Sequence, residues 1–329
     1  MTKRTKSGMG VGAVLAAVAG FALVAGPAQG QSWPTKPITI VVPFAAGGGT
    51  DAFARPLAAQ LDSQIGQRVL IENRAGAGGT VGASAASKAA PDGYTFFMGA
   101  AHHAIAPAIY PKLDYNLETD FIPIGLVARP PQVIVVHPKV PAKTLAELIA
   151  FAKANPDKLN YASAGAGTTH HLAGELFKSL TKTQIRHLPY RGAGPAMQDL
   201  VAGHVDMEFD GLGSSASQIQ GGTLRALAVA APQRSPAIPD VPTAAEAGLS
   251  GFEVSTWYAL WAPKNTPQDV IARMTKELTT ALQAPNITAA WAKNGSDVPN
   301  VTGAEFGAFV KSEIARWGKV VKDADVKLE

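Results

Sequence analysis

The sequence of 329 residues contains no cysteine. This absence excludes disulfide bonds, thiolate metal sites, a catalytic cysteine and the acylated cysteine of a lipoprotein. Charged residues make up only 16% of the chain and aromatic residues 7%, whereas 47% is hydrophobic. Such a chain is neither a disordered segment nor a strongly charged nucleic-acid-binding protein. We therefore expect a soluble α/β protein, and the length is sufficient for two domains.

The first thirty residues also lack acidic side chains. Three basic residues within positions 3–6 precede an apolar run at about 10–25, and small residues follow up to Gly30. This order is typical of a secretory signal peptide, and the apolar run is shorter than the roughly 20 residues that span a bilayer. We expect export to the periplasm, removal of residues 1–30 as a signal peptide, and no lipid anchor. The 29 basic side chains minus these three leave 26 against 25 acidic ones, so the mature charge says little about partners.

Short runs rich in β-branched residues alternate with Ala- and Leu-rich stretches from Trp33 onward. This alternation predicts βα units with parallel strands, arranged in two three-layer lobes. Strands are expected near 38–42, 69–71, 94–98, 124–127, 133–136, 159–162, 185–188, 205–209 and 224–229, and helices near 50–61, 81–89, 145–154, 169–180, 196–202, 267–282, 287–293 and 304–321. We assign residues 31–128 to the first part of lobe 1, 129–228 to lobe 2, and 229–329 to a return connection and the second part of lobe 1.

Two glycine-rich turns stand where an expected strand runs into an expected helix, one in each lobe. Their sequences are VPFAAGGGTD at 42–51 and SAGAGTTHH at 163–171. Glycine lets the backbone approach a ligand, and the free N–H groups at a helix start favour an anion. Each turn by itself is equally explained as a tight turn with a threonine cap. Because open α/β sheets bind ligands beyond the carboxyl ends of their strands, the pair predicts a cleft between the lobes.

Three polar side chains elsewhere are candidates for the far end of a ligand. Tyr190 and Arg191, in the turn PYRGAGP at 189–195, offer a hydroxyl and a fixed charge for a carboxylate. Arg191 is equally explained as a solvated surface residue. Asp210 ends an expected strand and is a candidate for holding a ligand cation or a water, or for capping the turn at Gly211.

The sequence lacks the motifs of nucleotide-binding sites, metal sites and serine hydrolases. Neither turn matches G-x-x-x-x-G-K-[ST], and the first does not fit G-x-G-x-x-G, so no nucleotide cofactor is expected. The histidines occur as adjacent pairs at 102–103 and 170–171, and adjacent helical residues point about 100° apart, so no metal site is expected. No G-x-S-x-G elbow supports a hydrolase built on Ser163, His171 and Asp210. We therefore predict that the chain is not an enzyme.

Several motifs resemble those of the Bug family, the TctC-like periplasmic receptors of tripartite tricarboxylate transporters, over almost all of the mature chain. They are VPFAAGGGTD at 42–51, ENRAGAGG at 72–79, PDGYT at 91–95, HLAGELF at 171–177, PYRG at 189–192, VD at 205–206 and PDVPT at 239–243. The resemblance implies a two-lobed Venus-flytrap fold, each lobe a Rossmann-like three-layer sandwich. It also implies that backbone amides and ordered waters of the first glycine-rich loop and of the loop before His171 hold one ligand carboxylate.

Two positions depart from the family pattern. The family often reads Thr-His-Ala-Ile-Asn-Pro where this chain has HHAIAP at 102–107, and lysine is frequent where Arg191 stands. The polar lining on that side of the cleft is therefore expected to differ. The usual ligands of the family do not carry over directly.

These observations support a periplasmic receptor that binds a small dicarboxylate, amino acid or aromatic acid and delivers it to the membrane permease subunits of a tripartite tricarboxylate transporter. A second hypothesis is a receptor whose loaded form docks on a signalling sensor protein, and a third is a periplasmic hydrolase. We expect a monomer with one ligand site, no cofactor, no metal and no nucleic-acid partner. The predicted ligand-binding residues are Phe44, Ala46, Gly47, Gly48, Thr50, Asp51, Ser163, Gly165, Gly167, Thr168, Thr169, His171, Tyr190, Arg191 and Asp210.

Overall fold

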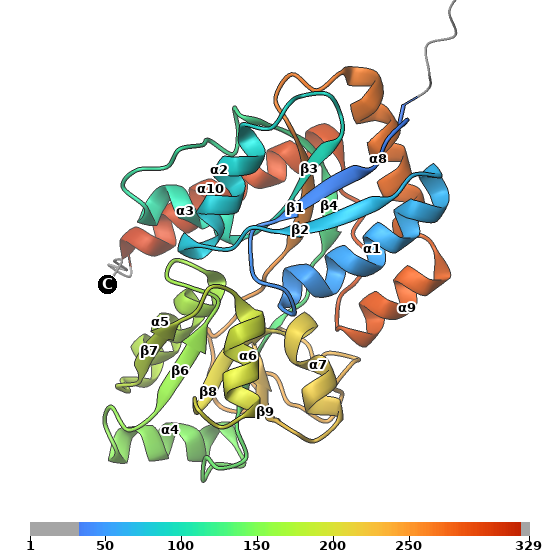
Figure 1. Cartoon of the computed structure of the whole chain (residues 1–329). Helices are drawn as coiled ribbons and strands as arrows, with labels where there is room; N and C mark the ends of the chain where they lie inside the picture. The colour runs from blue at the N-terminus through green and yellow to red at the C-terminus, as the bar shows by residue number, and fades with distance from the viewer. Residues whose placement is uncertain (1–32, 324–329) are drawn as a thin grey trace, which may run out of the picture. The chain divides into compact units, whose positions relative to one another are not determined.

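Two five-stranded sheets flanked by helices make up the structure (Figure 1). The computed structural model describes residues 33–323, so the predicted signal peptide lies outside the described residues. The first sheet has the strand order β2-β1-β3-β10-β4 and the second the order β7-β6-β8-β5-β9. This arrangement confirms the two predicted α/β lobes. We call the part around the first sheet lobe 1 and the part around the second lobe 2.

Lobe 1 contains both ends of the described chain. Its strands are β1 (Ile38–Val42), β2 (Val69–Asn73), β3 (Thr95–Ala100), β4 (Phe121–Ala128) and β10 (Tyr258–Pro263). Its helices are α1 (Gly49–Ile65), the short 3-10 helix Ala77–Gly79, α2 (Thr80–Ser87), α3 (His102–Ile109), α8 (Gln268–Leu282), α9 (Pro285–Lys293) and α10 (Gly303–Asp323). The C-terminal helices pack on this lobe: α8 and α9 contact α1, and α10 contacts α3 and β4.

Lobe 2 is formed by one continuous stretch of chain. Its strands are β5 (Gln132–Val136), β6 (Asn160–Ser163), β7 (Arg186–Pro189), β8 (Met207–Gly211) and β9 (Arg225–Val229), and its helices are α4 (Leu145–Ala154), α5 (Thr169–Thr181), α6 (Ala193–Val201) and α7 (Leu212–Gln220). Helix α4 has the bounds that the sequence predicts. Thr144 caps its first turn by accepting the N–H of Glu147, whose carboxylate accepts the N–H of Lys143; this is a variant of the capping box in which the second bond goes to the residue before the cap.

Two α-helices, α3 and α7, the short 3-10 helix and strand β10 were missed from the sequence. Helix α3 contains Pro107, a residue that usually interrupts a helix. The predicted βα units do have parallel strands, as in the pairs β1–β2 and β6–β7, but β10 runs antiparallel to β3 and β4, and β5 runs antiparallel to β8 and β9. The reason is connectivity. Strand β4 leads toward lobe 2 and β10 returns from it, and these two strands pair directly with each other.

The two segments in which the chain crosses between the lobes lie side by side. An isolated bridge pairs Pro131 with Ser255, and Thr256 donates its N–H to the carbonyl of Pro130 at 3.3 Å. Before the second crossing, the return connection follows lobe 2, where residues 230–254 bond back to the end of β9. Two adjacent crossings of this kind form a hinge about which the lobes can rotate.

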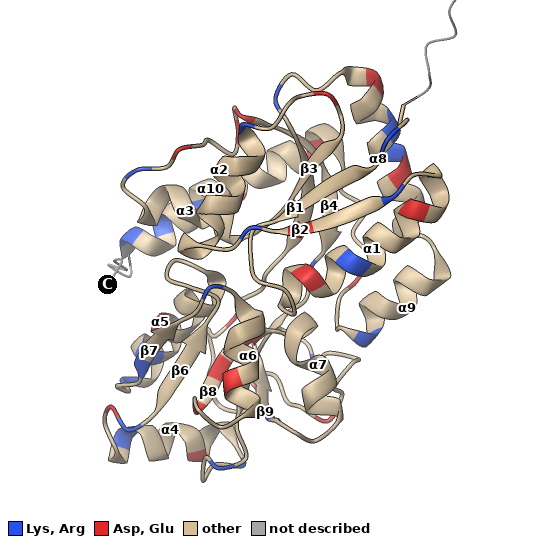
Figure 2. Ribbon diagram, viewed as in Figure 1, with Lys and Arg blue, Asp and Glu red and all other residues tan. Residues whose placement is uncertain are grey.

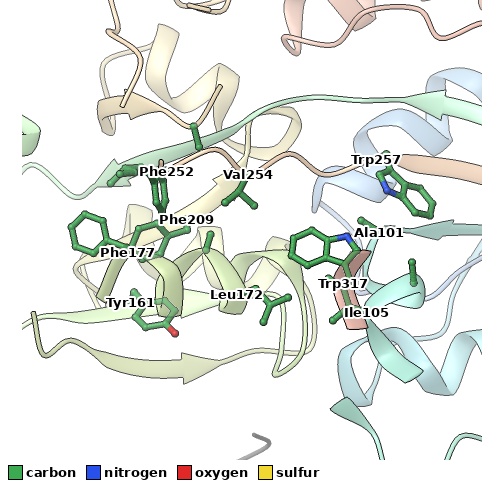
Figure 3. Packing of buried hydrophobic residues seen from close by; sticks show 14 of the residues in the cluster. Ala101, Ile105, Tyr161, Leu172, Phe177, Phe209, Phe252, Val254, Trp257 and Trp317 are labelled. Atoms are coloured by element: carbon green, nitrogen blue, oxygen red, sulfur yellow. The ribbon is translucent and has the colours of Figure 1, made fainter. Parts of the chain in front are cut away.

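One of the hydrophobic clusters contains buried residues from both lobes (Figure 3). In lobe 2, Phe252 packs against Phe177 and Phe209 at ring-centroid distances of 6.1 and 6.0 Å. In lobe 1, the buried indoles of Trp257 and Trp317 both donate to the carboxylate of Glu313. The shared core couples the lobes mechanically at this part of the molecule.

Charge is distributed evenly over the described residues. In the view of Figure 2, Lys and Arg are interspersed with Asp and Glu on the helices and loops of both lobes. Among residues 33–323, none of the helices has the length and apolar character that crossing a membrane requires.

Candidate functional site

A cavity of about 10 Å³ lies between the lobes. Lobe 1 lines it with the first glycine-rich loop, the start of α1, His102 and Tyr258, and lobe 2 contributes Ala164, His170 and Ala193. The volume holds about one water molecule. A ligand as large as a dicarboxylate therefore enters only when the lobes move apart.

The start of α1 lines this cavity with residues whose backbone N–H groups are unpaired. The helix has no side-chain cap, and within the described residues no acceptor takes the N–H groups of Gly48, Gly49 and Thr50. The preceding Gly47 has a φ of 86°, which favours glycine because a Cβ disfavours this backbone conformation. Three free donors at a helix N-terminus are a favourable environment for an anion.

Asp51, a predicted ligand-binding residue, holds the glycine-rich loop in place. Its Oδ2 accepts the N–H of Gly47 at 3.1 Å and the Nε of Arg55 at 2.6 Å, and its Oδ1 accepts the side-chain amide of Asn73 at 3.1 Å. The carboxylate is 4% exposed. Because protein donors already satisfy both oxygens, Asp51 positions the free N–H groups that follow Gly47.

The start of α5 in lobe 2 is bonded differently. Thr168 caps the helix by accepting the N–H of His171 at 3.4 Å, and its hydroxyl donates to the carbonyl of Gly165 at 2.7 Å. The N–H of Thr169 donates at 3.0 Å to Nδ1 of His102, which belongs to lobe 1. Burial, together with the charges of His170 and His103, lowers the pKa of His102 well below its usual value, which keeps this nitrogen an acceptor. His102 thus binds the helix terminus at which the sequence predicts a ligand carboxylate.

The loop around Ser163 forms a buried network. The Ser163 hydroxyl lies 2.6 Å from Nε2 of His187 and accepts the N–H of Gly165 at 3.1 Å. His187 stacks on His171 with a centroid distance of 4.2 Å. Burial lowers the pKa of His187 to about 3. The hydroxyl is therefore bonded to a neutral histidine that sequence reasoning did not connect with it.

Tyr190 and Arg191 do not line the cavity. The Tyr190 hydroxyl donates to the carboxylate of Asp199 at 2.6 Å, and the side chain of Arg191 is exposed. This turn contacts lobe 1 through its backbone, because the carbonyl of Arg191 accepts the N–H of Ala45 at 3.2 Å across the boundary between the two lobes. The contact links the first glycine-rich loop to lobe 2.

Replacing Arg191 by alanine is expected to leave the affinity for monocarboxylates and dicarboxylates unchanged within about 0.5 kcal/mol, because an exposed side chain outside the cavity is removed and the backbone contact remains. Calorimetric titration of the variant with one acid of each class measures this. A selective loss of dicarboxylate binding would instead place the guanidinium on a second ligand carboxylate.

A buried group of ionisable side chains lies next to the cavity. Nδ1 of His170 is 3.2 Å from Oε1 of Glu208 and 3.9 Å from Oδ1 of Asp210. Burial raises the pKa of Glu208 well above its usual value, and burial together with the neighbouring Glu208 raises the pKa of Asp210 to about 7. Of these three residues the sequence indicated only Asp210, because the other two join it through tertiary contacts.

The predicted residues therefore divide into two groups. Phe44, Gly48, Thr50 and Asp51 line the cavity, whereas Ala46, Gly47, Ser163, Gly165, Gly167, Thr168, Thr169, His171, Tyr190, Arg191 and Asp210 lie outside its wall. Sequence reasoning missed Tyr258, whose hydroxyl faces the start of α1: a Cβ on Gly49 would lie 2.1 Å from it. The apolar run at 257–263 was the available signal, since it encodes β10, which begins at Tyr258 beside the site.

Comparison with curated proteins identifies relatives over most of the chain. A protein encoded in the tcbD–tcbE intergenic region of Pseudomonas sp. is 40% identical over 292 residues, covering 88% of this chain and 87% of that protein. The protein BugT of Bordetella pertussis is 37% identical over 308 residues, covering 93% of this chain and 94% of BugT.

Solved structures show the same architecture. The periplasmic binding protein BugD matches with a TM-score of 0.87 and 36% identity, over 90% of this chain and all of BugD. An R. palustris protein solved with adipate matches with a TM-score of 0.86 and 36% identity, over 90% of this chain and 99% of that one. MatC from Rhodopseudomonas palustris with bound malate matches with a TM-score of 0.83 and 37% identity, over 88% of this chain and all of MatC.

The family model described as the tripartite tricarboxylate transporter family receptor, TctC, matches residues 53–326. This span includes most of lobe 1 and all of lobe 2, and therefore the start of α5. Together with the Bug relatives and the two-lobed structures, it confirms the resemblance seen in the motifs. The chain belongs to the TctC family of tripartite tricarboxylate transporter receptors, the Bug-type periplasmic solute-binding proteins.

Proposed function

We propose that this receptor binds a small carboxylate between lobe 1 and lobe 2 and delivers it to the permease subunits of a tripartite tricarboxylate transporter. The observation that carries the proposal is the start of α1, where Gly48, Gly49 and Thr50 line the cavity and their N–H groups have no acceptor among the described residues. The structures of relatives with adipate and malate support the choice of ligand class.

The charge of the ligand is compensated by the backbone. Among the described residues, no Lys or Arg lines the cavity, so the positive end of the α1 dipole and its N–H groups supply the attraction for an anion. The cavity wall also contains His102, which burial keeps neutral. A monoanionic carboxylate group therefore fits this end of the cleft without a counter-cation.

The cavity volume of about 10 Å³ requires an opening step. Rotation about the paired crossings at Pro131 and Ser255 separates Ala45 from the turn at Arg191, and His102 from Thr169. A carboxylate that enters can then accept the Thr169 N–H that His102 accepts in the closed arrangement. Ligand binding in this scheme replaces protein–protein contacts by protein–ligand contacts in both lobes.

A thermal-shift screen tests the proposal. The full mature protein is melted with a panel that includes malate, adipate, amino acids and aromatic acids, each paired with its neutral amide of similar size. One acid at 100 times its dissociation constant is expected to stabilise the protein by about 2.7 kcal/mol, while its amide has no effect. The absence of a shift with every acid, or an equal shift with acid and amide, would rule out the carboxylate assignment.

A transport experiment tests the second half of the proposal. Deleting the gene is expected to abolish uptake of the labelled acid that the screen identifies. Unchanged uptake in the deletion strain would contradict delivery of the acid to a permease, while the proposal that the protein binds the acid would stand.

A further inference from the structure

The cluster formed by His170, Glu208 and Asp210 has the geometry of a metal-binding site. One ligand atom from each of the three residues lies within 4.8 Å of the other two. Glu208 and Asp210 are two positions apart on β8, so both side chains point to the same face of the sheet, where α5 supplies His170. Ligands at the usual zinc distances of about 2.0–2.2 Å are separated from one another by about 3.3 Å in a tetrahedron, close to the 3.2 and 3.9 Å measured from His170.

Unpartnered oxygens in this cluster point independently to a ligand. Oε2 of Glu208 and Oδ2 of Asp210 have no hydrogen-bond partner, and both residues are 0% exposed. The hydroxyl of Ser215, also 0% exposed, lies close enough to the Asp210 carboxyl to lower its pKa, so Oε2 of Glu208 is the stronger of the two indications. Buried carboxylate oxygens without a donor or a cation are strongly unfavourable, so their presence indicates a group that completes the site.

The donor set selects the kind of cation. Imidazole nitrogens and carboxylate oxygens are both ligands of Zn²⁺, and three protein ligands with one water complete its four-coordinate tetrahedral site. Mg²⁺ and Ca²⁺ require six or more oxygen ligands, more than three buried side chains offer. The carboxylate of Asp210 is oriented by the hydroxyl of Ser214, which donates to Oδ1 at 2.5 Å and leaves Oδ2 free.

We propose that His170, Glu208 and Asp210 bind a divalent transition-metal ion of the Zn²⁺ type beside the ligand cleft. The ion takes the place of the protons that the cluster holds without metal, namely the one shared by His170 and Glu208 and the one on Asp210 where that carboxyl is protonated, and these protons leave to solvent. His170 lines the cavity between the lobes and therefore provides a path by which the ion enters. The adjacent histidine pairs in the sequence gave no sign of this site, because its ligands come from α5 and β8 and not from neighbouring positions.

Zinc binding to the full mature protein tests the proposal without reference to its carboxylate. Protein stripped with a chelator is titrated with ZnCl₂ by calorimetry and, after desalting, its metal content is measured by mass spectrometry. We expect one zinc per chain, and at least about 100-fold weaker binding in Glu208→Gln and Asp210→Asn, which remove charged ligands with little change of shape. His204→Gln is the matched control, because its side chain is 70% exposed and contacts Asp199, which is not part of the cluster.

Circular dichroism of each variant establishes that it is folded. Substitution of the wild-type protein with Co²⁺ gives a second measurement that needs no variant, since a buried tetrahedral site produces strong visible absorption and loose surface binding does not. Absence of retained zinc, wild-type affinity in Glu208→Gln, loss of zinc in His204→Gln, or weak cobalt absorption would each overturn the proposal.

Discussion

Replacing Gly194 by alanine is expected to weaken carboxylate binding by about 100-fold. A Cβ at this position would lie 2.1 Å from the carbonyl oxygen of Ala46 and 3.1 Å from the nitrogen of Gly48. Both of these atoms belong to the backbone of lobe 1, whereas Gly194 belongs to α6 in lobe 2. Because backbone atoms cannot rotate away as a side chain can, the added Cβ holds the two lobes apart. Overpacking of this kind costs about 1–3 kcal/mol, and the upper end corresponds to about 100-fold in Kd.

Alanine is compatible with the helical backbone of α6, so lobe 2 itself is expected to fold normally. Calorimetric titration with the acid found by thermal shift measures the loss. The matched control is Gly318→Ala in α10, where an added Cβ meets no heavy atom within 4 Å. It should bind normally and gain up to about 1 kcal/mol of stability, because alanine favours a helix more than glycine does. Wild-type affinity in Gly194→Ala would show that ligand binding does not require closure along this boundary between the two lobes.

The free energy of unfolding is expected to fall as the pH decreases below about 6.5. Burial, together with the charges of His171 and Lys178, lowers the pKa of His187 to about 3, and burial lowers the pKa of His103 to about 4. Both values lie below the pKa of about 6.5 of an unfolded histidine, so the unfolded chain binds these protons first. The contribution of these two histidines to the free energy of unfolding is fully present above pH 6.5. It decreases as the pH falls and is lost at about pH 3 to 4. Each histidine contributes up to about 1.4 kcal/mol per pH unit.

The variant His187→Gln isolates one of these contributions. Its unfolding free energy, measured with denaturant between pH 4 and 6.5, should depend on pH less steeply than that of the wild type by up to about 1.4 kcal/mol per unit. Asp210, with a pKa raised to about 7, acts in the opposite sense because the folded chain retains its proton as the pH rises. Its contribution is present in both proteins and cancels from the comparison. The exposed His204→Gln is the control, and equal slopes in His187→Gln and the wild type would contradict the assignment.

Local sequence was sufficient to determine most of the secondary structure and the family. The apolar runs and their spacing predicted nine of the ten strands and eight of the ten α-helices, because alternation, capping residues and glycine turns act within a few positions. Thr144 and Glu147 illustrate this, since both halves of the capping box lie within one turn of α4. The same local signals placed the two glycine-rich loops at strand-to-helix junctions, where the structure has them.

Tertiary structure decided which of those residues act together. The direction of β10 depends on a chain that leaves lobe 1 and returns to it, and no local pattern encodes that direction. His102 accepts the N–H of Thr169 from 67 positions away, and Glu208 lies beside His170 across 38 positions. Hydrogen bonds and burial depend on distance in space, whereas periodicity reports only distance along the chain. The sequence by itself therefore determined the family and the anion-favouring start of α1. Only the packing of the two lobes decided that Asp51 supports the loop, that Arg191 is exposed and that three buried ionisable side chains meet beside the cleft.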